Sequence, residues 1–198
     1  SQADVKGSNK DWKADYAWTL EGDGGSWEVQ TANPIHENNP HYAVVDVKEG
    51  GDVALVNGGF DGIVLRKGEK YDLSLFAKQL EGKGGKIRVS LVQDGQVVAQ
   101  TTLKAPKKEW KKMTAVLKAG ADADKASIKV EPLGEGKVGL DLISLFPQNT
   151  FKGRKNGMRA DLAQTLADMK PKFMRFPGGC AAHGDGLHNI YNWKETIG

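Results

Sequence analysis

Arg175 is the residue whose surroundings best suit it to bind a ligand. It lies in the short apolar segment 173–176, which ends abruptly in the turn Pro177-Gly178-Gly179. A guanidinium at the C-terminal end of a strand in a (β/α) barrel lies on the active-site rim, where its rigid donors can orient carboxylates or sugar hydroxyls. The glycines let the backbone approach a ligand closely. We therefore predict that Arg175 binds substrate.

The loop after this turn carries weaker candidates for chemistry. His183, Asp185 and His188 have a spacing that suggests a metal site, but the glycines between them break any helix that would fix their geometry. A solvated loop is the favoured interpretation. Cys180 is the only cysteine of the chain and has no evident ordered partner, so we expect a small thiol at a rim or in a core rather than a nucleophile.

Aromatic side chains matter because sugar rings stack on flat faces. Large aromatics mostly pack in cores, so each one needs weighing against that role. Trp110 opens an alternating segment and is expected to be structural, whereas Trp12 and Trp18 lie in a loop-like leader and could be exposed. The aromatics considered are Trp12, Trp18, Trp27, Tyr42, Phe60 and Trp110, of which Trp12, Trp18 and Trp27 are the candidates for sugar stacking.

Asp141 stands inside the otherwise apolar segment 140–143. A carboxylate there should be exposed at an edge, hydrogen-bonded, or bound to calcium. We predict no cofactor other than this candidate structural calcium. A glycosidase also needs two carboxylates facing each other about 5 to 10 Å apart across a cleft. No pair of acids at a strand end stands out in this sequence, and we assign no catalytic residue.

The elements that must position these residues are mostly strands. From about residue 27 to residue 146 apolar residues alternate with polar ones, the pattern of half-buried strands. Gly-rich turns separate them, and Asp94-Gly95 is the strongest hairpin signal because glycine tolerates the positive φ that a tight turn requires. The pattern predicts an antiparallel β-sandwich, a galactose-binding-like jelly roll. The predicted strands cover 42–47, 52–56, 71–76, 86–92, 96–103, 110–117, 127–130 and 138–145.

The pattern of residue types changes after Pro147. Residues 148–157 are polar and indicate a linker. Apolar residues then recur at helical spacing from Met158 to Met169, and Lys170-Pro171 marks the end of this helix. The short strand 173–176 follows. We predict a sandwich over 1–147, a linker over 148–157, and one helix-strand unit of an incomplete (β/α)8 barrel over 158–198.

Charge and hydropathy exclude several classes of partner. Across 198 residues, 28 basic and 25 acidic side chains give a net charge of +3, and the lysines of 104–112 are better explained as a solvated face than as a nucleic-acid patch. No apolar run approaches the roughly 18 residues of a membrane helix. We expect neither nucleic acid nor a membrane as partner. The polar start at Ser1 would conceal a cleaved export signal, and we expect a periplasmic or extracellular protein.

The sequence resembles α-L-arabinofuranosidases of glycoside hydrolase family 51. The resemblance is specific from Asp141 through Arg175-Phe-Pro-Gly-Gly-Cys180, and Tyr191-Asn-Trp-Lys-Glu-Thr-Ile-Gly198 continues it. Before Asp141 it is looser. Asn57-Gly-Gly-Phe-Asp-Gly-Ile63, Lys67-Gly-Glu-Lys-Tyr71 and Gly139-Leu-Asp-Leu-Ile-Ser-Leu145 look like a family 4/9 carbohydrate-binding module, which some of these enzymes carry as an insertion.

This resemblance implies an N-terminal fragment of a retaining hydrolase that releases terminal arabinofuranose from arabinan or arabinoxylan. Arg175 matches an arginine of the sugar subsite, Cys180 a subsite position that is asparagine in many members, and Trp193 an aromatic near the active-site mouth. Neither catalytic glutamate falls within this chain, so the fragment is expected to be inactive. The parent enzyme could be oligomeric.

Two other roles stay open for the sandwich. It could be a non-catalytic binding module for these polysaccharides, with exposed aromatics as its contacts. It could also be purely structural and brace the barrel without touching sugar. Burial of the tryptophans Trp12, Trp18 and Trp27 would favour bracing.

Overall fold

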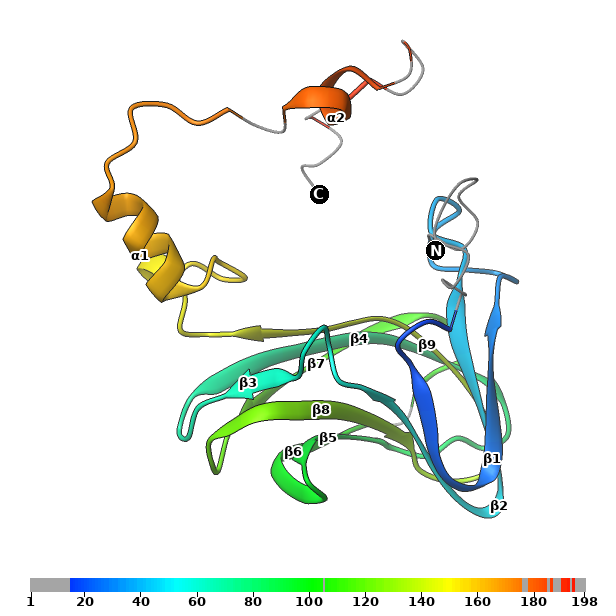
Figure 1. Ribbon diagram of the computed structural model, residues 1–198. Coiled ribbons are helices and arrows are strands. Elements are labelled where there is room, and N and C mark those ends of the chain that lie inside the picture. The colour runs from blue at the N-terminus through cyan, green and yellow to red at the C-terminus, as the bar shows by residue number, and fades with distance from the viewer. Residues whose placement is uncertain are drawn as a thin grey trace. The chain divides into compact units, whose positions relative to one another are not determined.

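The computed structural model describes residues 15–104, 106–175, 178–184, 186, 190–192 and 194. The chain divides into two compact units, residues 1–157 and residues 158–198. The first unit contains all the described strands (Figure 1). These are β1 (Thr19–Gln30), β2 (Tyr42–Asn57), β3 (Ile63–Leu65), β4 (Lys70–Glu81), β5 (Ile87–Gln93), β6 (Gln96–Leu103), β7 (Lys111–Lys118), β8 (Ala123–Pro132) and β9 (Gly136–Pro147).

All described strand pairs are antiparallel, and the strand order is β6-β5-β8-β2-β9-β4-β7. The long strand β2 belongs to two layers. Its residues 43–47 pair with β9, whereas its residues 55–57 pair with β8. One layer therefore contains β6, β5, β8 and the end of β2, and the other contains the start of β2, β9, β4 and β7 (Figure 1). The short strand β3 adds to β8.

Strand β1 follows β2 through both layers and bends with it. Its residues 19–23 pair with 52–56 of β2, and its residues 25–30 pair with 42–47. The bend requires glycine, because a Cβ on Gly22 would lie 1.9 Å from the carbonyl oxygen of Asp52, and Gly22 has φ +92°. Such close backbone contact leaves no room for a side chain.

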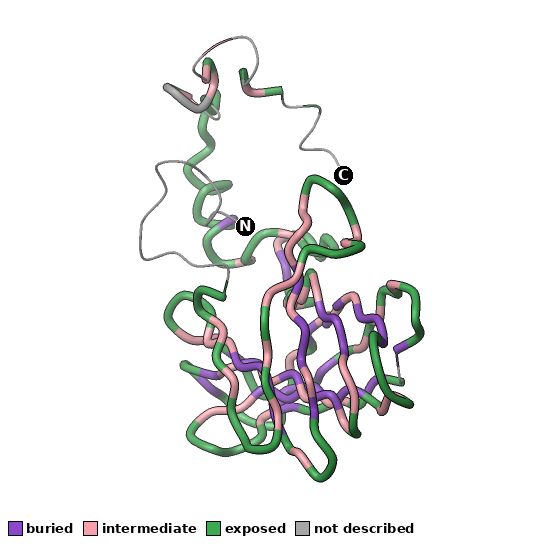
Figure 2. The backbone as a smooth tube through the Cα atoms, turned by 90° about the vertical axis from the view of Figure 1, so that its right-hand side faces the viewer, coloured by how far each residue is buried: buried purple, intermediate pink, exposed green. Residues whose placement is uncertain are grey.

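The core lies between the two layers. Alternate side chains of β4 and β5 point inward, and Leu73, Leu75, Ile87 and Val89 are almost fully buried in one apolar cluster with residues of β2, β7, β8 and β9. Figure 2 shows the buried residues concentrated in these strands. The alternation that buries one face of each strand leaves the other face polar, and this outer face is where ligands can reach the sandwich.

The predicted antiparallel sandwich is confirmed. Strand β6 covers the predicted residues 96–103, and Asp94 and Gly95, with φ of 51° and 77°, form the tight turn between β5 and β6. The two segments predicted as strands 42–47 and 52–56 form the single bent strand β2. Strands β1 and β3 were not predicted: β1 is interrupted by glycines and β3 has three residues.

The segment after β9 remains tied to the sandwich before the second unit begins. The backbone N–H of Gln148 donates to Lys70 O (2.9 Å), and its side chain donates to Asp72 Oδ1 (2.7 Å). A 3₁₀ turn, η2 (Phe151–Gly153), follows. Residues 148–157, predicted as a linker, therefore belong to the first unit.

The second unit contains the helices α1 (Ala160–Asp168) and α2 (Gly179–His183). The predicted helix is present as α1, whose apolar side chains Leu162 and Leu166 are exposed. The strand predicted at 173–176 is not formed in its described residues 173–175, because a strand needs a hydrogen-bonded neighbour and the described residues offer none there. Neither described helix is long and apolar enough to cross a membrane.

A buried lysine organises the outer face of the second layer. Lys78 is 6% exposed, and its Nζ lies 4.6 Å from the ring centres of both Tyr42 and Trp110. The two rings meet edge to face at 5.0 Å. Lys78 Nζ and Trp110 Nε1 both donate to Asn33 O, at 2.9 and 3.0 Å. Burial lowers the pKa of Lys78. Trp110 is thus structural, as predicted, and fixes the loop 31–41 on β4 and β9.

We expect Trp110→Ala to reduce the free energy of unfolding by about 2 kcal/mol, measured by urea denaturation. The substitution removes an edge-to-face ring contact, a cation–π contact and a hydrogen bond. Phe60→Ala is the matched control, because Phe60 is fully exposed and its removal should change stability by less than about 0.5 kcal/mol. Equal effects of the two substitutions would show that the cluster does not stabilise the fold.

Candidate functional site

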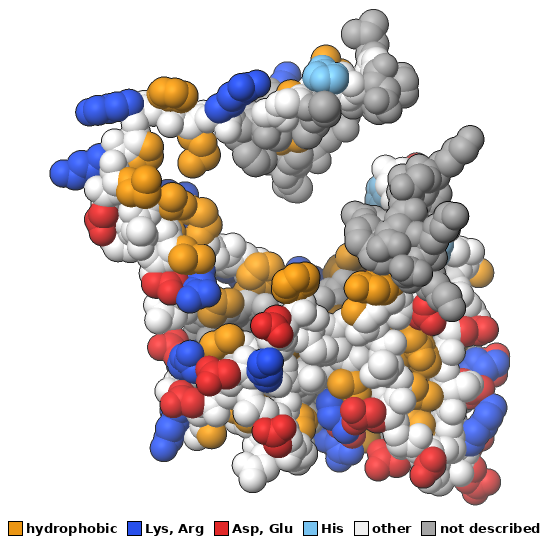
Figure 3. Space-filling view, in the orientation of Figure 1, with side chains coloured by type: hydrophobic (Ala, Val, Ile, Leu, Met, Phe, Trp, Pro, Cys, Tyr) orange, Lys and Arg blue, Asp and Glu red, His pale blue; other side chains and the backbone are white. Residues whose placement is uncertain are grey.

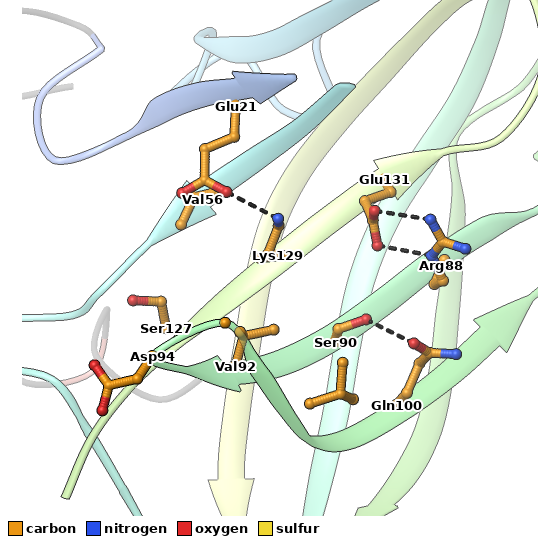
Figure 4. A pocket seen from close by; sticks show the side chains of 12 residues that line it. Glu21, Val56, Arg88, Ser90, Val92, Asp94, Gln100, Ser127, Lys129 and Glu131 are labelled. Atoms are coloured by element: carbon orange, nitrogen blue, oxygen red, sulfur yellow. Dashed lines mark hydrogen bonds and ion pairs between the residues drawn. The ribbon is translucent and has the colours of Figure 1, made fainter. Parts of the chain in front are cut away.

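A polar groove lies on the outer face of the first layer, where β5, β6 and β8 meet the ends of β1 and β2 (Figure 4). Its volume is about 480 Å³. Strand alternation produces it: the inward residues of β5 and β8 fill the core, and the residues between them point out. The residues that line the polar groove are Glu21, Val56, Arg88, Ser90, Val92, Asp94, Gly95, Val97, Gln100, Ser127, Lys129 and Glu131.

A bidentate ion pair fixes one end of the polar groove. Arg88 Nε and Nη2 donate to the two carboxylate oxygens of Glu131 at 2.8 and 2.9 Å. The hydrogen bonds from Arg88 lower the pKa of Glu131 despite its partial burial, and those to Glu131 raise the pKa of Arg88. Glu131 therefore stays ionised and acts as an acceptor in a fixed orientation.

Two further pairs order the rest of the polar groove. Lys129 Nζ lies 2.8 Å from Glu21 Oε2, and the Ser90 hydroxyl donates to Gln100 Oε1 at 3.2 Å. The amide nitrogen of Gln100 and the hydroxyl of Ser127 have no hydrogen-bond partner within the described part of the chain. These groups can exchange hydrogen bonds with the hydroxyls of a neutral sugar.

Sequence reasoning missed the polar groove. No aromatic ring is among its described lining residues, so the search for stacking tryptophans passed over it. The signal was present as Arg88, Ser90, Lys129 and Glu131 at the polar positions of two alternating strands. Such positions are ordinary on any half-exposed strand, and only the pairing of β5 with β8 brings them together.

Two of the three predicted stacking residues lie together elsewhere. Trp18 and Trp27 line a smaller pocket of about 280 Å³ with Asp141, at one end of the sandwich. Both tryptophans are half-buried and pack against the apolar core. Trp12 lies outside the described residues. The packing of Trp18 and Trp27 against the core favours a structural role for both residues.

Asp141 is a partly buried carboxylate. Its Oδ1 accepts a hydrogen bond from the backbone N–H of Leu142 at 2.7 Å, whereas its Oδ2 is buried and has no hydrogen-bond partner. Burial raises the pKa of Asp141. An unpartnered oxygen of this kind could coordinate a cation, but no group of three His, Cys, Asp or Glu residues suited to a metal lies among the described residues. Calcium at Asp141 stays a prediction.

The candidates of the second unit are only partly described. Arg175 is exposed, and its Nε lies 3.9 Å from the position that a Cβ on Gly178 would take. Gly178 and Gly179 both have positive φ, as expected for a turn that brings the backbone close to a side chain. Cys180 lies in helix α2. His183 is exposed, and its Nδ1 lies 2.6 Å from Gly184 O. Trp193, Asp185 and His188 lie outside the described residues.

Two protein-family profiles match this sequence, one in each of its two parts. The profile of the family described as a carbohydrate binding domain matches residues 8–134, more than half of the chain. The chain belongs to this carbohydrate-binding family. The profile of the alpha-L-arabinofuranosidase 1 domain matches residues 165–198, the region that contains Arg175.

Most of the sequence is similar to known arabinofuranosidases. It is 30% identical over 193 residues to alpha-L-arabinofuranosidase 1 of Arabidopsis thaliana, and 30% identical over 194 residues to an extracellular exo-alpha-L-arabinofuranosidase of Streptomyces chartreusis. Each match covers 92% of this chain, which spans only 28% and 22% of the length of these two relatives.

Two solved structures are similar to this chain, and this similarity concerns its fold and not its function. The enzymatically active domain of tailspike protein 4 of bacteriophage CBA120 superposes with a TM-score of 0.53 at 16% identity, over 67% of this chain and 19% of that chain. A cyclase from Fischerella sp. TAU superposes with a TM-score of 0.51 at 18% identity, over 67% of this chain and 84% of that chain.

Asp141→Asn should raise the melting temperature of the carbohydrate-binding domain by a few degrees at pH 7 without added metal. The raised pKa of Asp141 means that native-state stability falls as pH rises from below the carboxyl's ordinary value through its folded value. The gain from asparagine should therefore shrink towards pH 3. Thermal unfolding across this pH range measures it, with Asp23→Asn at an exposed position of β1 as control.

A calcium titration of the same two proteins tests the metal prediction separately. If Asp141 is a calcium ligand, added calcium raises the melting temperature of the unmodified chain and not that of Asp141→Asn. Equal responses of the two proteins would exclude Asp141 as the ligand.

Proposed function

We propose that this chain is part of an α-L-arabinofuranosidase that releases terminal arabinofuranose from arabinan or arabinoxylan. The match of residues 165–198 to an arabinofuranosidase domain supports this, as do relatives of that name along 92% of the chain. In this proposal the sandwich holds the polysaccharide. Arg175, Cys180 and Trp193 contribute to the arabinose subsite. The name of the Streptomyces relative supports export to the periplasm or the cell exterior.

The single observation that carries the binding role is the polar groove. Its charged side chains are already paired with each other, by Arg88 with Glu131 and by Lys129 with Glu21. Paired charges present oriented donors and acceptors without a large net field, which suits neutral hydroxyl-rich sugars. With no aromatic ring among its described lining residues, binding rests on hydrogen bonds and is expected to be weak.

A structural role is the second candidate for the tryptophan pocket. Trp18 and Trp27 are half-buried and pack against the core, which supports a structural role for these two residues. We propose that these two residues stabilise the end of the sandwich, while the polar groove contacts sugar.

Gln100→Ala combined with Ser127→Ala should weaken binding to arabinan or arabinoxylan by roughly tenfold, because two hydrogen-bonding groups of the polar groove are lost. Affinity gel electrophoresis with each polysaccharide measures the retardation. The control pair is Ser26→Ala and Gln30→Ala, on the part of β1 that lies in the other layer. If no polysaccharide retards the unmodified chain, the binding role is wrong.

This chain alone should not hydrolyse an aryl α-L-arabinofuranoside. Glu131 of the polar groove is unsuited to act as a general acid, because it is ion-paired with Arg88 and its pKa is lowered. Release of the aryl group is followed by absorbance against a blank without protein. Any turnover by the purified chain above that blank would contradict the proposal.

A further inference from the structure

A second groove, of different chemistry, lies where the edges of the two layers meet. Strand β6 pairs only with β5 and β7 only with β4 among the described strands, so each leaves one edge without a ladder. A backbone hydrogen bond from Gly120 N–H to Val98 O (2.8 Å) links the two edges at one end. Next to this hydrogen bond, residues of β6, of β7 and of the segment between them line a groove of about 400 Å³.

This lysine groove carries an uncompensated positive charge. Four exposed lysines line it, and no acidic side chain is among its described lining residues. None of the four forms an ion pair with any residue that the structure describes. Along the sequence, 104–112 holds five lysines and one glutamate. The residues that line the lysine groove are Thr101, Thr102, Leu103, Lys104, Pro106, Lys107, Lys111, Lys112, Met113, Thr114 and Ala115.

The lysine groove contrasts with the rest of the sandwich surface. Elsewhere charged side chains of both signs are interspersed, as Figure 3 shows for one face, and six ion pairs join described residues of the sandwich. Unpaired lysines on two neighbouring edges create a local positive potential that attracts anions. Three threonine hydroxyls in the lysine groove, on Thr101, Thr102 and Thr114, have no hydrogen-bond partner among the described residues and can bind a ligand's hydroxyls.

We propose that the lysine groove binds the carboxylates of an acidic polysaccharide, a chain that contains uronic acid residues. Such a polymer presents a carboxylate and several hydroxyls on each charged sugar, which matches a groove lined by both lysines and threonines. The lining has no arginine for bidentate phosphate contacts and no aromatic ring for base stacking, so it is less suited to nucleic acid. The choice of a polysaccharide rests on the proposed function.

The test compares binding of the full chain to polygalacturonate, to its methyl-esterified form and to single-stranded DNA in affinity gels. We expect retardation by polygalacturonate that weakens when salt rises from about 0.05 to about 0.5 M, and little retardation by the ester, which has the same backbone without charge. Lys107→Gln combined with Lys111→Gln should weaken this binding roughly fivefold. Lys48→Gln combined with Lys67→Gln removes the same charge elsewhere on the sandwich, from β2 and from the turn before β4, and should leave this binding unchanged.

Three outcomes would overturn the inference: no retardation by polygalacturonate, equal loss in the control pair, or equally tight binding of the DNA. In the first case the lysines serve only to keep two strand edges from pairing with other chains. Arabinan gels run in parallel separate this inference from the proposed function. Substitutions in the lysine groove should not change arabinan binding, and Gln100→Ala with Ser127→Ala should not change polygalacturonate binding.

Discussion

The sandwich depends on one strand that both layers share. The start of β2 pairs with β9 and its end pairs with β8, so the bend between them fixes how the two layers face each other. Strand β1 can follow this bend only because Gly22 allows its backbone to meet that of Asp52 without a side chain between them. The polar groove follows from this pairing, since β1 contributes Glu21 and β2 contributes Val56 to a surface otherwise made by β5, β6 and β8.

Alternation then determines what each surface can bind. Because one face of every strand is buried, every second residue of a strand points to the outer face, and the cross-strand neighbours of these residues decide whether charges are paired. Arg88 of β5 stands opposite Glu131 of β8 in the ladder and forms a bidentate pair with it. On the other layer, Lys78 has aromatic neighbours instead of an acid, and it becomes a buried structural cation between Tyr42 and Trp110.

Local patterns predicted the fold, whereas the polar groove depends on strand pairing that no local pattern shows. The strand at 96–103 could be predicted because its alternation follows the turn Asp94-Gly95, and both signals are local. Strand β1 could not, because glycines break its pattern and the need for them arises only from contact with β2. The apolar segment around Asp141 drew attention to this carboxylate, and the structure shows it partly buried with one oxygen that has no hydrogen-bond partner.

In the second unit, composition alone was a poor guide to secondary structure. The apolar segment before Pro177 has the composition of a buried parallel strand, but composition supplies no partner, and residues 173–175 form no ladder. The adjoining turn is present nonetheless, because positive φ at Gly178 and Gly179 is a local property that needs no neighbour.

The two grooves of the sandwich differ in the one property that decides ligand charge. In the polar groove each cation has an acidic partner within 2.9 Å, so a charged ligand would have to compete with an existing ion pair. In the lysine groove the cations have no such partner among the described residues, and their mutual repulsion is relieved only by an anion from solution or from a ligand. One sandwich could thus hold a neutral and an acidic sugar chain at separate surfaces, because the face of a layer pairs its charges across strands while an edge has no strand to pair with.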